Sequence, residues 1–327
     1  MRALVFADWV AGMQCVQSRE RHARVEEGAA LVEPVDGSSG MTFDGDVRYG
    51  LAVGEALLLD VLTPDPRPAG LMPALIWVHG GGWESGDKRG GFSDTFGPML
   101  ARAGFVFVSV NYRLSDRAIF PAQLHDVKAA VRWVRAHADE LGIDPERIGV
   151  WGHSAGGHLA ALIGTTGDLP ELEGESGSPG ISSRVQAVVA LSPATDFLEL
   201  PDGWPHVEPR RATEKLVGGP LKERAELVRL ANPMMHIRPG TPPFLIVHGA
   251  DDGVVPVEQA VKLAAALEAA GCETTLEVLP GADHWFASEA RGVTTPDALR
   301  TIGQQAIAFF DTYLHTTRAH AQAHHDA

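Results

Sequence analysis

Short apolar runs bounded by glycine and proline recur along the chain from about residue 47 onward. They are rich in Val, Ile, Leu and Phe, which is typical of β-strands that are buried on both faces. The runs that we predict as strands cover residues 57–63, 74–80, 105–111, 147–152, 185–192, 244–249 and 274–280.

Segments with helical spacing lie between these strands. The predicted helices cover residues 92–103, 121–140, 155–164, 257–271 and 297–315. Buried strands that alternate with helices indicate an α/β fold, with a mostly parallel central sheet of about eight strands and helices on both faces.

Two stretches interrupt this rhythm, residues 165–183 and residues 197–232. The second follows a predicted strand, so it begins at the carboxyl edge of the sheet, where α/β proteins bind ligands. Either stretch could form a small lid or cap over such a site, or a surface loop, and the sequence leaves this choice open.

The two ends of the chain fall outside the pattern. Residues 1–46 contain a turn cluster from Asp36 to Gly40 and no sustained periodicity, so we expect an N-terminal extension. Residues 318–327 are expected to form a disordered tail. Residues 47–317 are then expected to form one domain, because α/β folds often exceed the usual domain length.

Acidic residues outnumber basic ones. The 327 residues include 27 Lys and Arg and 42 Asp and Glu, which gives a formal net charge of −15. A field of this sign repels phosphate backbones and anionic lipids, so we expect neither a nucleic acid nor a membrane as a partner. We expect a cytoplasmic protein, because no apolar stretch is as long as a membrane-spanning helix and the first residues lack the features of a signal peptide.

The spacing of the cysteines and histidines predicts neither a metal site nor a thiol redox site. Cys15 and Cys272 lie in unrelated segments without CxxC spacing, so neither a thiol redox motif nor a cysteine zinc site is predicted. The histidines lack spacing such as HExxH, and we predict no metal site.

One local motif supplies a nucleophile. The residues Gly152-His153-Ser154-Ala155-Gly156 come directly after a predicted strand and directly before a helix of small residues. A GxSxG sequence in this context is typical of a tight turn that exposes the serine hydroxyl at the edge of the sheet. Ser154 is therefore the predicted nucleophile.

A second motif, His79-Gly80-Gly81-Gly82-Trp83, stands at the end of the predicted strand 74–80. Consecutive glycines leave backbone N–H groups uncovered, and such groups can bind a developing oxyanion. A flexible turn and a phosphate cradle are the alternatives, but a phosphate loop would end in Gly-Lys-Ser/Thr, which is absent here. His79 is predicted to brace the loop.

A serine nucleophile needs a base, and the base needs an orienting acid. His284 lies in a loop after the last predicted strand, and Asp251 and Asp252 follow the strand 244–249. From the residues alone, one aspartate is the acid and the other caps a helix or forms a turn. The histidines His153, His158 and His248 are predicted to pack or hydrogen-bond the turns near the site.

These motifs resemble the α/β-hydrolase superfamily, in the branch that includes hormone-sensitive-lipase-like esterases and bacterial feruloyl and acetylxylan esterases. The matching segments are HGGGWESGDKR (79–89), SVNYRLSDRAIFPAQLHDVKAAVRWVRAH (109–137), IDPERIGVWGHSAGGHLAAL (143–162), HGADDGVVP (248–256) and GADHWF (281–286). The resemblance implies an α/β-hydrolase fold with a catalytic domain over residues 47–317.

The resemblance also implies a catalytic triad of Ser154, Asp252 and His284, in the chain order of that superfamily. It thereby favours Asp252 over Asp251 as the acid. The sequence departs from similar proteins at Asp283, where glycine is common. A carboxylate there would raise the basicity of the histidine or face solvent.

The same resemblance implies an oxyanion hole made by the N–H groups of Gly81, Gly82 and Ala155. It implies a serine carboxylesterase that hydrolyses short-chain acyl, acetyl or feruloyl-type esters through an acyl-enzyme, without a cofactor or metal. The alternatives are an amidase or aryl formamidase with the same triad, similar to kynurenine formamidases, and a non-catalytic binding protein of the same fold.

Four ring-bearing residues are candidates for the substrate pocket: Trp83, His153, Trp204 and Trp285. The tryptophan rings could stack on an aromatic or sugar ring, or pack in the wall of the site. The expected partner is a small-molecule ester. Association into a homo-oligomer, through an edge strand or the extension, is left open.

Overall fold

The computed structural model describes residues 40–198 and 207–315 of the chain. From Met41 onward the chain clusters as one unit, separate from residues 1–40. Trp204 and residues 318–327 lie outside the described residues, as does nearly all of the expected N-terminal extension.

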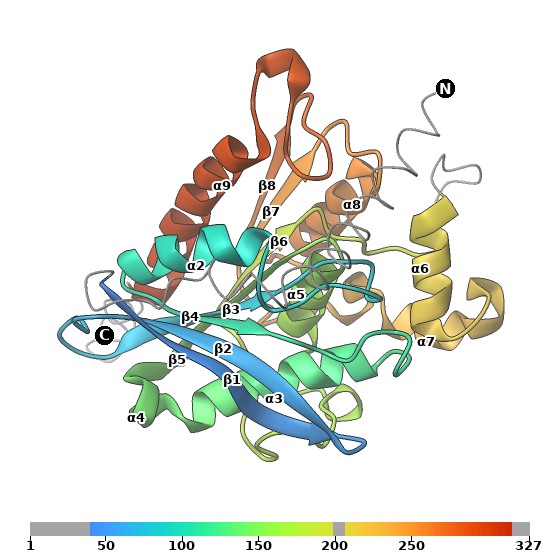
Figure 1. The fold of residues 1–327 in the computed structure, drawn as a ribbon. Coiled ribbons are helices and arrows are strands. Elements are labelled where there is room, and N and C mark those ends of the chain that lie inside the picture. The colour runs from blue at the N-terminus through green and yellow to red at the C-terminus, as the bar shows by residue number, and fades with distance from the viewer. Residues whose placement is uncertain (1–39, 199–206, 316–327) are drawn as a thin grey trace, which may run out of the picture. The chain divides into compact units, whose positions relative to one another are not determined.

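Eight strands form one sheet in the order β1-β2-β4-β3-β5-β6-β7-β8 (Figure 1). β1 pairs antiparallel with β2, and β2 with β4, whereas all other neighbours are parallel. The predicted mostly parallel sheet is thereby confirmed. The strands are β1 Met41–Ala52, β2 Glu55–Pro64, β3 Met72–Val78, β4 Val106–Val110, β5 Ile143–His153, β6 Ala187–Leu191, β7 Phe244–Gly249 and β8 Thr274–Leu279.

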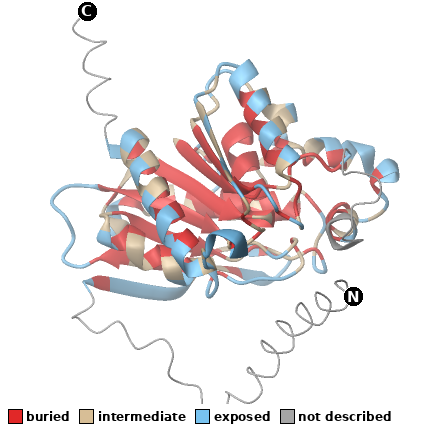
Figure 2. Ribbon diagram, turned by 90° about the horizontal axis from the view of Figure 1, so that it is seen from above, coloured by how far each residue is buried: buried red, intermediate tan, exposed pale blue. Residues whose placement is uncertain are grey.

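Helices cover both faces of this sheet (Figures 1 and 2). On one face lie α3 (Ala122–Ala136), α5 (Ala155–Thr166) and α8 (Val257–Ala269), and on the other lie α2 (Phe92–Arg102) and α9 (Thr295–Phe310). Shorter helical segments are α4 Ala138–Leu141, η1 Pro170–Leu172, η2 Leu221–Arg224, η3 Pro233–His236, η4 Glu289–Arg291 and η5 Asp311–His315.

Strand β3 shows why the strands are apolar throughout. All of its residues are buried. Ala74, Ile76 and Val78 belong to the hydrophobic core on one face of the sheet, and Leu75 and Trp77 belong to the core on the other face. A strand between two cores has no polar side, which is the pattern of a central parallel strand.

The N-terminal boundary expected at residue 46 is corrected by strand β1, which begins at Met41. This strand lies at the edge of the sheet, and its residues 42–46 are all exposed. Register shifts between Asp44 and Val47 and between Arg48 and Gly50 interrupt its alternation further. An edge strand with an exposed, irregular first half lacks the apolar periodicity on which the prediction depended.

The first interrupting stretch packs on α3. Because α5 runs antiparallel to the parallel strands, this stretch leaves α5 and returns to β6 at the amino edge of the sheet. Lys128 of α3 is fully buried and donates to the carbonyl of Thr166 at 2.6 Å and to the carboxylate of Glu173 at 2.5 Å. Arg132 donates to the other oxygen of Glu173 at 2.9 Å. These buried charges hold the stretch on the body of the domain, away from the predicted site.

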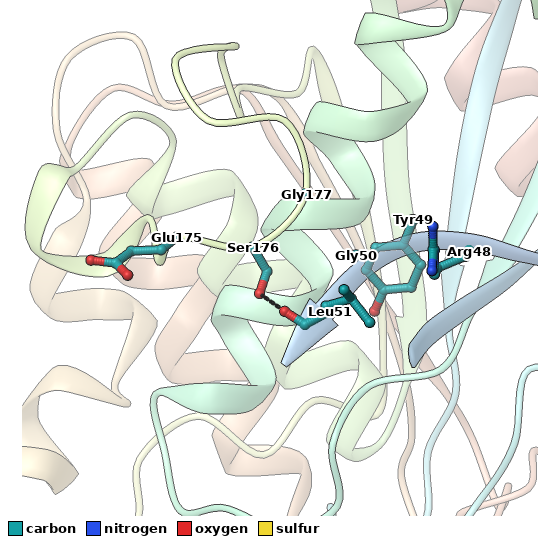
Figure 3. Close-up of a pocket in the computed structure, with 7 residues that line it drawn as sticks. All are labelled: Arg48, Tyr49, Gly50, Leu51, Glu175, Ser176 and Gly177. Atoms are coloured by element: carbon teal, nitrogen blue, oxygen red, sulfur yellow. Dashed lines mark hydrogen bonds between the residues drawn. The ribbon is translucent and has the colours of Figure 1, made fainter. Parts of the chain in front are cut away.

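A groove lies between β1 and this stretch (Figure 3), lined by Arg48, Tyr49, Gly50, Leu51, Glu175, Ser176 and Gly177. Ser176 Oγ donates to the carbonyl of Leu51 at 2.7 Å. The buried Tyr49 hydroxyl donates to the carbonyl of Asn111 at 2.5 Å. The hydrogen bond from Ser176 therefore joins the first stretch to the edge strand across this groove.

The second interrupting stretch contains two helices that the sequence pattern missed, α6 (Val207–Val217) and α7 (Ala225–Leu230). The sequence of α6, VEPRRATEKLV, is dominated by charged and small residues, so it has few of the apolar residues by which a buried helix is predicted. The stretch begins after β6 at the carboxyl edge of the sheet. Figure 1 shows α6 and α7 on the opposite side of the domain from α2 and α9.

Candidate active site

Ser154 occupies the turn between β5 and α5. Its φ is 57° and its ψ is −118°, a backbone conformation that is strained for a residue with a side chain. Its N–H donates to the carbonyl of Leu191 on β6 at 2.8 Å, and its carbonyl accepts from the N–H of His158 on α5 at 2.9 Å. The turn is therefore fixed on both sides at the carboxyl edge of the sheet.

Close backbone contacts explain the two glycines of this motif. A Cβ at Gly152 would lie 2.5 Å from the carbonyl oxygen of Gly156, and a Cβ at Gly156 would collide with the carbonyl of Val78 on β3. A side chain at either position would push the turn away from β3. The sharp turn at Ser154 thus depends on both glycines.

The glycine loop, residues 79–83, runs beside this turn. A Cβ at Gly80 would lie 3.4 Å from the Cβ of Ser154. Gly81 and Gly82 have φ angles of 106° and 59°, which favour glycine. Within the described part of the chain, no protein acceptor takes the N–H of Gly81, Gly82 or Ala155. Their role in binding an oxyanion stays a prediction.

His79 braces the start of the glycine loop. The Tyr112 hydroxyl donates to the His79 carbonyl at 3.0 Å, and the two rings stack with centroids 4.3 Å apart. Burial lowers the pKa of His79, so its imidazole is neutral near pH 7. Tyr112 thus fixes the strand end from which the loop departs.

Trp83 ends the loop and is buried. Its Nε1 donates to Nδ1 of His158 at 3.2 Å, and its ring packs edge-on against His158 and Phe197. Nε2 of His158 donates in turn to the carbonyl of Ala231, at the end of the second stretch, at 2.6 Å. Burial lowers the pKa of His158 to about 4. The indole of Trp83, a pocket candidate, therefore packs in the wall of the site.

His284 and Asp252 lie side by side on the loops that follow β8 and β7. The distance from Nδ1 of His284 to Oδ2 of Asp252 is 2.7 Å, and both side chains are buried. Asp251 is exposed, and its N–H donates to the carbonyl of Ala282 at 2.9 Å. The structure thus places Asp252, and not Asp251, against the imidazole.

The carboxylate of Asp252 accepts several further hydrogen bonds. Oδ1 accepts from the N–H groups of Val254 and Val255, both at 2.8 Å, and Oδ2 lies 3.1 Å from Nε2 of His248. Burial raises the pKa of Asp252, but the hydrogen bonds from His248 and His284 outweigh burial and hold this pKa well below its usual range. The contact of His248 with the carboxylate was not foreseen from the sequence.

His153, another pocket candidate, joins the serine turn to the histidine loop. Its Nε2 lies 2.9 Å from the carbonyl oxygen of His284, and the two rings are 4.7 Å apart. Burial, with a contribution from the nearby His284, lowers the pKa of His153 to about 3. The ring is neutral, its Nε2 donates to the carbonyl, and it packs between Phe92 and Phe286.

The histidine loop is organised by Asp283. Its Oδ1 accepts from the N–H groups of Trp285 and Ala287, both at 2.9 Å. Asp283 therefore shapes the loop around His284, a role that neither of the two predicted alternatives included. Trp285, the third pocket candidate, is half-buried, and its ring stands edge-on to His284 at 5.2 Å.

Comparison with known proteins places this site in a family. The BD-FAE family model matches residues 59–267, which include the glycine loop, Ser154 and Asp252. This match covers more than half of the chain. The chain belongs to the BD-FAE family. The Dienelactone hydrolase family model matches residues 228–314, which include His284.

Proteins and solved structures that are similar to this BD-FAE protein carry esterase names. It is 37% identical to the probable carboxylic ester hydrolase LipM of Mycobacterium tuberculosis, over 66% of this chain and 50% of LipM. A truncated carbohydrate esterase from gut microbiota superposes with a TM-score of 0.74 and 29% identity, over 84% of this chain and 97% of that one. Thermogutta terrifontis esterase 2 gives a TM-score of 0.63 and 30% identity, over 82% of this chain and 94% of that one.

Two predictions are thereby confirmed, the α/β-hydrolase fold and the resemblance of the chain to esterases of that superfamily. The chain spans about half the length of the curated relatives that it matches.

Helix α6 of this BD-FAE protein borders the glycine loop. Nζ of Lys215 lies 2.9 Å from Oε2 of Glu84, just past the loop. A Cβ at Gly82 would lie 3.4 Å from the Cβ of Ala212. The N–H of Phe120 donates to the carbonyl of Leu216 at 2.8 Å. The second stretch therefore forms a wall beside the glycine loop, and its residues were missed because the helix itself was missed.

Residues 40–198 and 207–315 hold no group of three or more His, Cys, Asp or Glu side chains arranged to bind a metal ion. Nor do they include a helix of the length and apolar character that crossing a membrane requires.

Proposed function

We propose that this BD-FAE protein is a carboxylic ester hydrolase in which Ser154, His284 and Asp252 form a catalytic triad. The observation that carries the proposal is the 2.7 Å hydrogen bond between Nδ1 of His284 and Oδ2 of Asp252. His153 connects the loop of His284 to the strained turn of Ser154. The esterase names of the relatives support the same reaction.

The proposed reaction begins at the hydroxyl of Ser154. Because Nδ1 of His284 donates to Asp252, Nε2 is the nitrogen that accepts the proton while Oγ attacks the ester carbonyl. The imidazolium, stabilised by the charged Asp252, then protonates the leaving alcohol. Water attacks the acyl-enzyme by the same route, releases the carboxylic acid and restores the serine.

The negative charge that develops on the carbonyl oxygen is bound by backbone groups. In this proposal the N–H groups of Gly81, Gly82 and Ala155 donate to it. Because these groups have no protein acceptor among the described residues, no hydrogen bond within the described part of the protein has to be broken when the oxyanion forms. Such fixed donors stabilise the transition state more than the ground state, and this difference lowers the activation barrier.

For the substrates, we propose esters of short acyl groups, with acetyl and feruloyl-type esters included. The gut protein named above is a carbohydrate esterase, and Thermogutta esterase 2 is known with propionate and with butyrate bound. Of the predicted aromatic contacts, Trp83 is packed in the wall. Trp285, half-buried against His284, is the described ring that we propose to contact the substrate.

The test compares wild type with Ser154→Ala on para-nitrophenyl acetate, butyrate and octanoate, methyl ferulate and N-formylkynurenine. We expect the short esters to be hydrolysed fastest, and kcat to fall by at least about a thousandfold in the variant. Ser176→Ala, at the groove of β1, serves as the matched control and should retain full activity. Paraoxon should add one phosphoryl group to wild type and none to Ser154→Ala, as intact-mass spectrometry would detect.

Other outcomes would redirect the assignment. Substantial ester hydrolysis by Ser154→Ala would refute the triad. Faster turnover of N-formylkynurenine than of any ester would make the protein a formamidase with the same triad. Absence of turnover of every compound, together with no reaction with paraoxon, would favour a binding protein.

A further inference from the structure

A second histidine contacts the aspartate of the proposed triad. Nε2 of His248, at the carboxyl end of β7, lies 3.1 Å from Oδ2 of Asp252 and 2.9 Å from the carbonyl oxygen of Val255. A carbonyl only accepts hydrogen bonds, so Nε2 must carry the proton. His248 is therefore a donor to the carboxylate, from a side chain that is completely buried.

Both oxygens of the Asp252 carboxylate accept hydrogen bonds, each from different donors. Oδ1 accepts from the backbone N–H groups of Val254 and Val255. Oδ2 accepts from two imidazoles, His284 and His248. Without His248, the base would be the only partner of Oδ2 among the described residues.

Packing alone does not explain a histidine at this position. Nδ1 of His248 is buried and has no hydrogen-bond partner in the described chain. A buried ring nitrogen without a partner destabilises the folded state relative to an apolar side chain of similar volume. The polar side chain is therefore accounted for by the contacts of Nε2.

We infer that His248 is a positioning residue that shares Oδ2 of Asp252 with His284 and so sets how strongly the aspartate holds the protonated base. The inference rests on the proposed triad. A donated hydrogen bond draws negative charge away from Oδ2, which weakens its attraction for an imidazolium. The same bond limits rotation of the carboxylate, so Nε2 of His284 keeps its direction toward the serine.

The other titratable groups near this pair are His153, Asp283 and Asp251. His153 faces His284 from the serine turn and is neutral, because burial lowers its pKa to about 3. Asp283, on the histidine loop, is held by backbone N–H groups, and Asp251 is exposed. Because His153 stays uncharged near pH 7, a change in the titration of His284 on removal of His248 is assigned to the hydrogen bond at Oδ2.

The experiment compares His248→Leu, which removes the donor, with His248→Gln, whose terminal N–H₂ restores one. For each, kcat and KM are measured against pH on the best ester. In His248→Leu we expect the acidic limb of kcat/KM to move to higher pH by about half a unit, since the base binds its proton more tightly. We expect kcat to fall about fivefold with KM unchanged, and His248→Gln to recover the wild-type limb.

A second measurement does not depend on turnover. The Nδ1 proton of His284 can be followed by NMR in histidine-labelled protein, with His284→Gln for assignment. In His248→Leu its signal should titrate at higher pH than in wild type and in His248→Gln. If wild type hydrolyses no ester, the proposed function fails, but this titration still decides the inference.

The inference would be overturned if folded His248→Leu kept both the wild-type acidic limb of kcat/KM and the wild-type titration of His284. His248 would then have a packing role. If His248→Leu does not fold, His248→Asn takes its place, because its amide is too short to reach Oδ2. Urea unfolding of each variant establishes that folded proteins are compared.

Discussion

The two stretches that interrupt the α/β rhythm are attached to the domain in opposite ways. The first is held to α3 by buried charges, with Lys128 and Arg132 on either side of Glu173. The second is held by the partly exposed pair of Lys215 and Glu84, beside the glycine loop, and by the neutral hydrogen bond from His158 to the carbonyl of Ala231.

The difference follows from where each stretch leaves the sheet. The first starts and ends at the amino edge, where no site residue lies, so its contacts serve only stability. The second starts at the carboxyl edge, beside the loop that is proposed to bind the oxyanion. We therefore expect changes in the first stretch to alter the free energy of unfolding, and changes in the second to alter activity.

The largest expected effect is that of Glu173→Gln in the first stretch. The neutral side chain leaves Lys128 and Arg132 buried without a counter-charge, and we expect the free energy of unfolding to fall by about 4 kcal/mol. Urea denaturation measures this loss. Steady-state kinetics at 25 °C should give kcat and KM close to those of wild type.

Glu175→Gln is the matched control, because no ion pair involves Glu175 among the described residues. Its free energy of unfolding should change by less than about 0.5 kcal/mol. If Glu173→Gln kept the free energy of unfolding of wild type but lost much of its kcat/KM, the assignment of stability to the first stretch and activity to the second would be wrong.

The next effect appears on acidification, because each stretch is contacted by a histidine, buried His158 or half-buried His125, whose pKa is lowered by burial. Burial lowers the pKa of His158, which holds Ala231 of the second stretch, from 6.5 to about 4. Below pH 6.5 the unfolded chain binds a proton that the folded protein excludes, so stability falls as the pH falls to about 4. His158 contributes about 3 kcal/mol to this loss, and His158→Gln should lack that part when unfolding is measured against pH.

His125→Gln separates the two regions. His125 packs against Gly174 of the first stretch, and burial lowers its pKa to about 4 as well. This variant should also flatten the dependence of stability on pH, but it should keep the wild-type kcat/KM at pH 8. Equal losses of activity in both variants would show that the first stretch reaches the site.

The smallest expected effect is that of Lys215→Met, which breaks the ion pair with Glu84. A partly exposed pair contributes little to folding, so the free energy of unfolding should change by less than about 1 kcal/mol. Because α6 borders the glycine loop, we expect kcat/KM for the short esters to fall about threefold to fivefold. Arg184→Gln, which breaks a comparable pair with Asp168 in the first stretch, should leave kcat/KM unchanged.

The central strands could be predicted because a parallel strand covered on both faces must be apolar along its whole length. β1 and α6 escaped prediction for the converse reason. The first half of β1 is exposed at the edge of the sheet, and α6 is rich in charged residues, so neither has the apolar content of a buried element.

In the candidate site, too, some residues could be predicted from the sequence and others could not. The turn of Ser154 and the glycine loop are local, and their sequence context reveals them. His284 and Asp252 lie apart in the chain and were paired through the order of strands and the family resemblance. The contacts of His248, Asp283 and Lys215 depend on side-chain directions that only the folded chain fixes, and no sequence signal distinguished them.

The bond from His153 to the histidine loop has a consequence for redesign of the protein. Nε2 of His153 donates to the main-chain carbonyl of His284, not to its side chain. The spacing between residue 154 and residue 284 is therefore set by a contact that any amino acid at position 284 would preserve. A new side chain introduced there, for a reaction other than hydrolysis, would inherit its distance from the serine without rebuilding either loop.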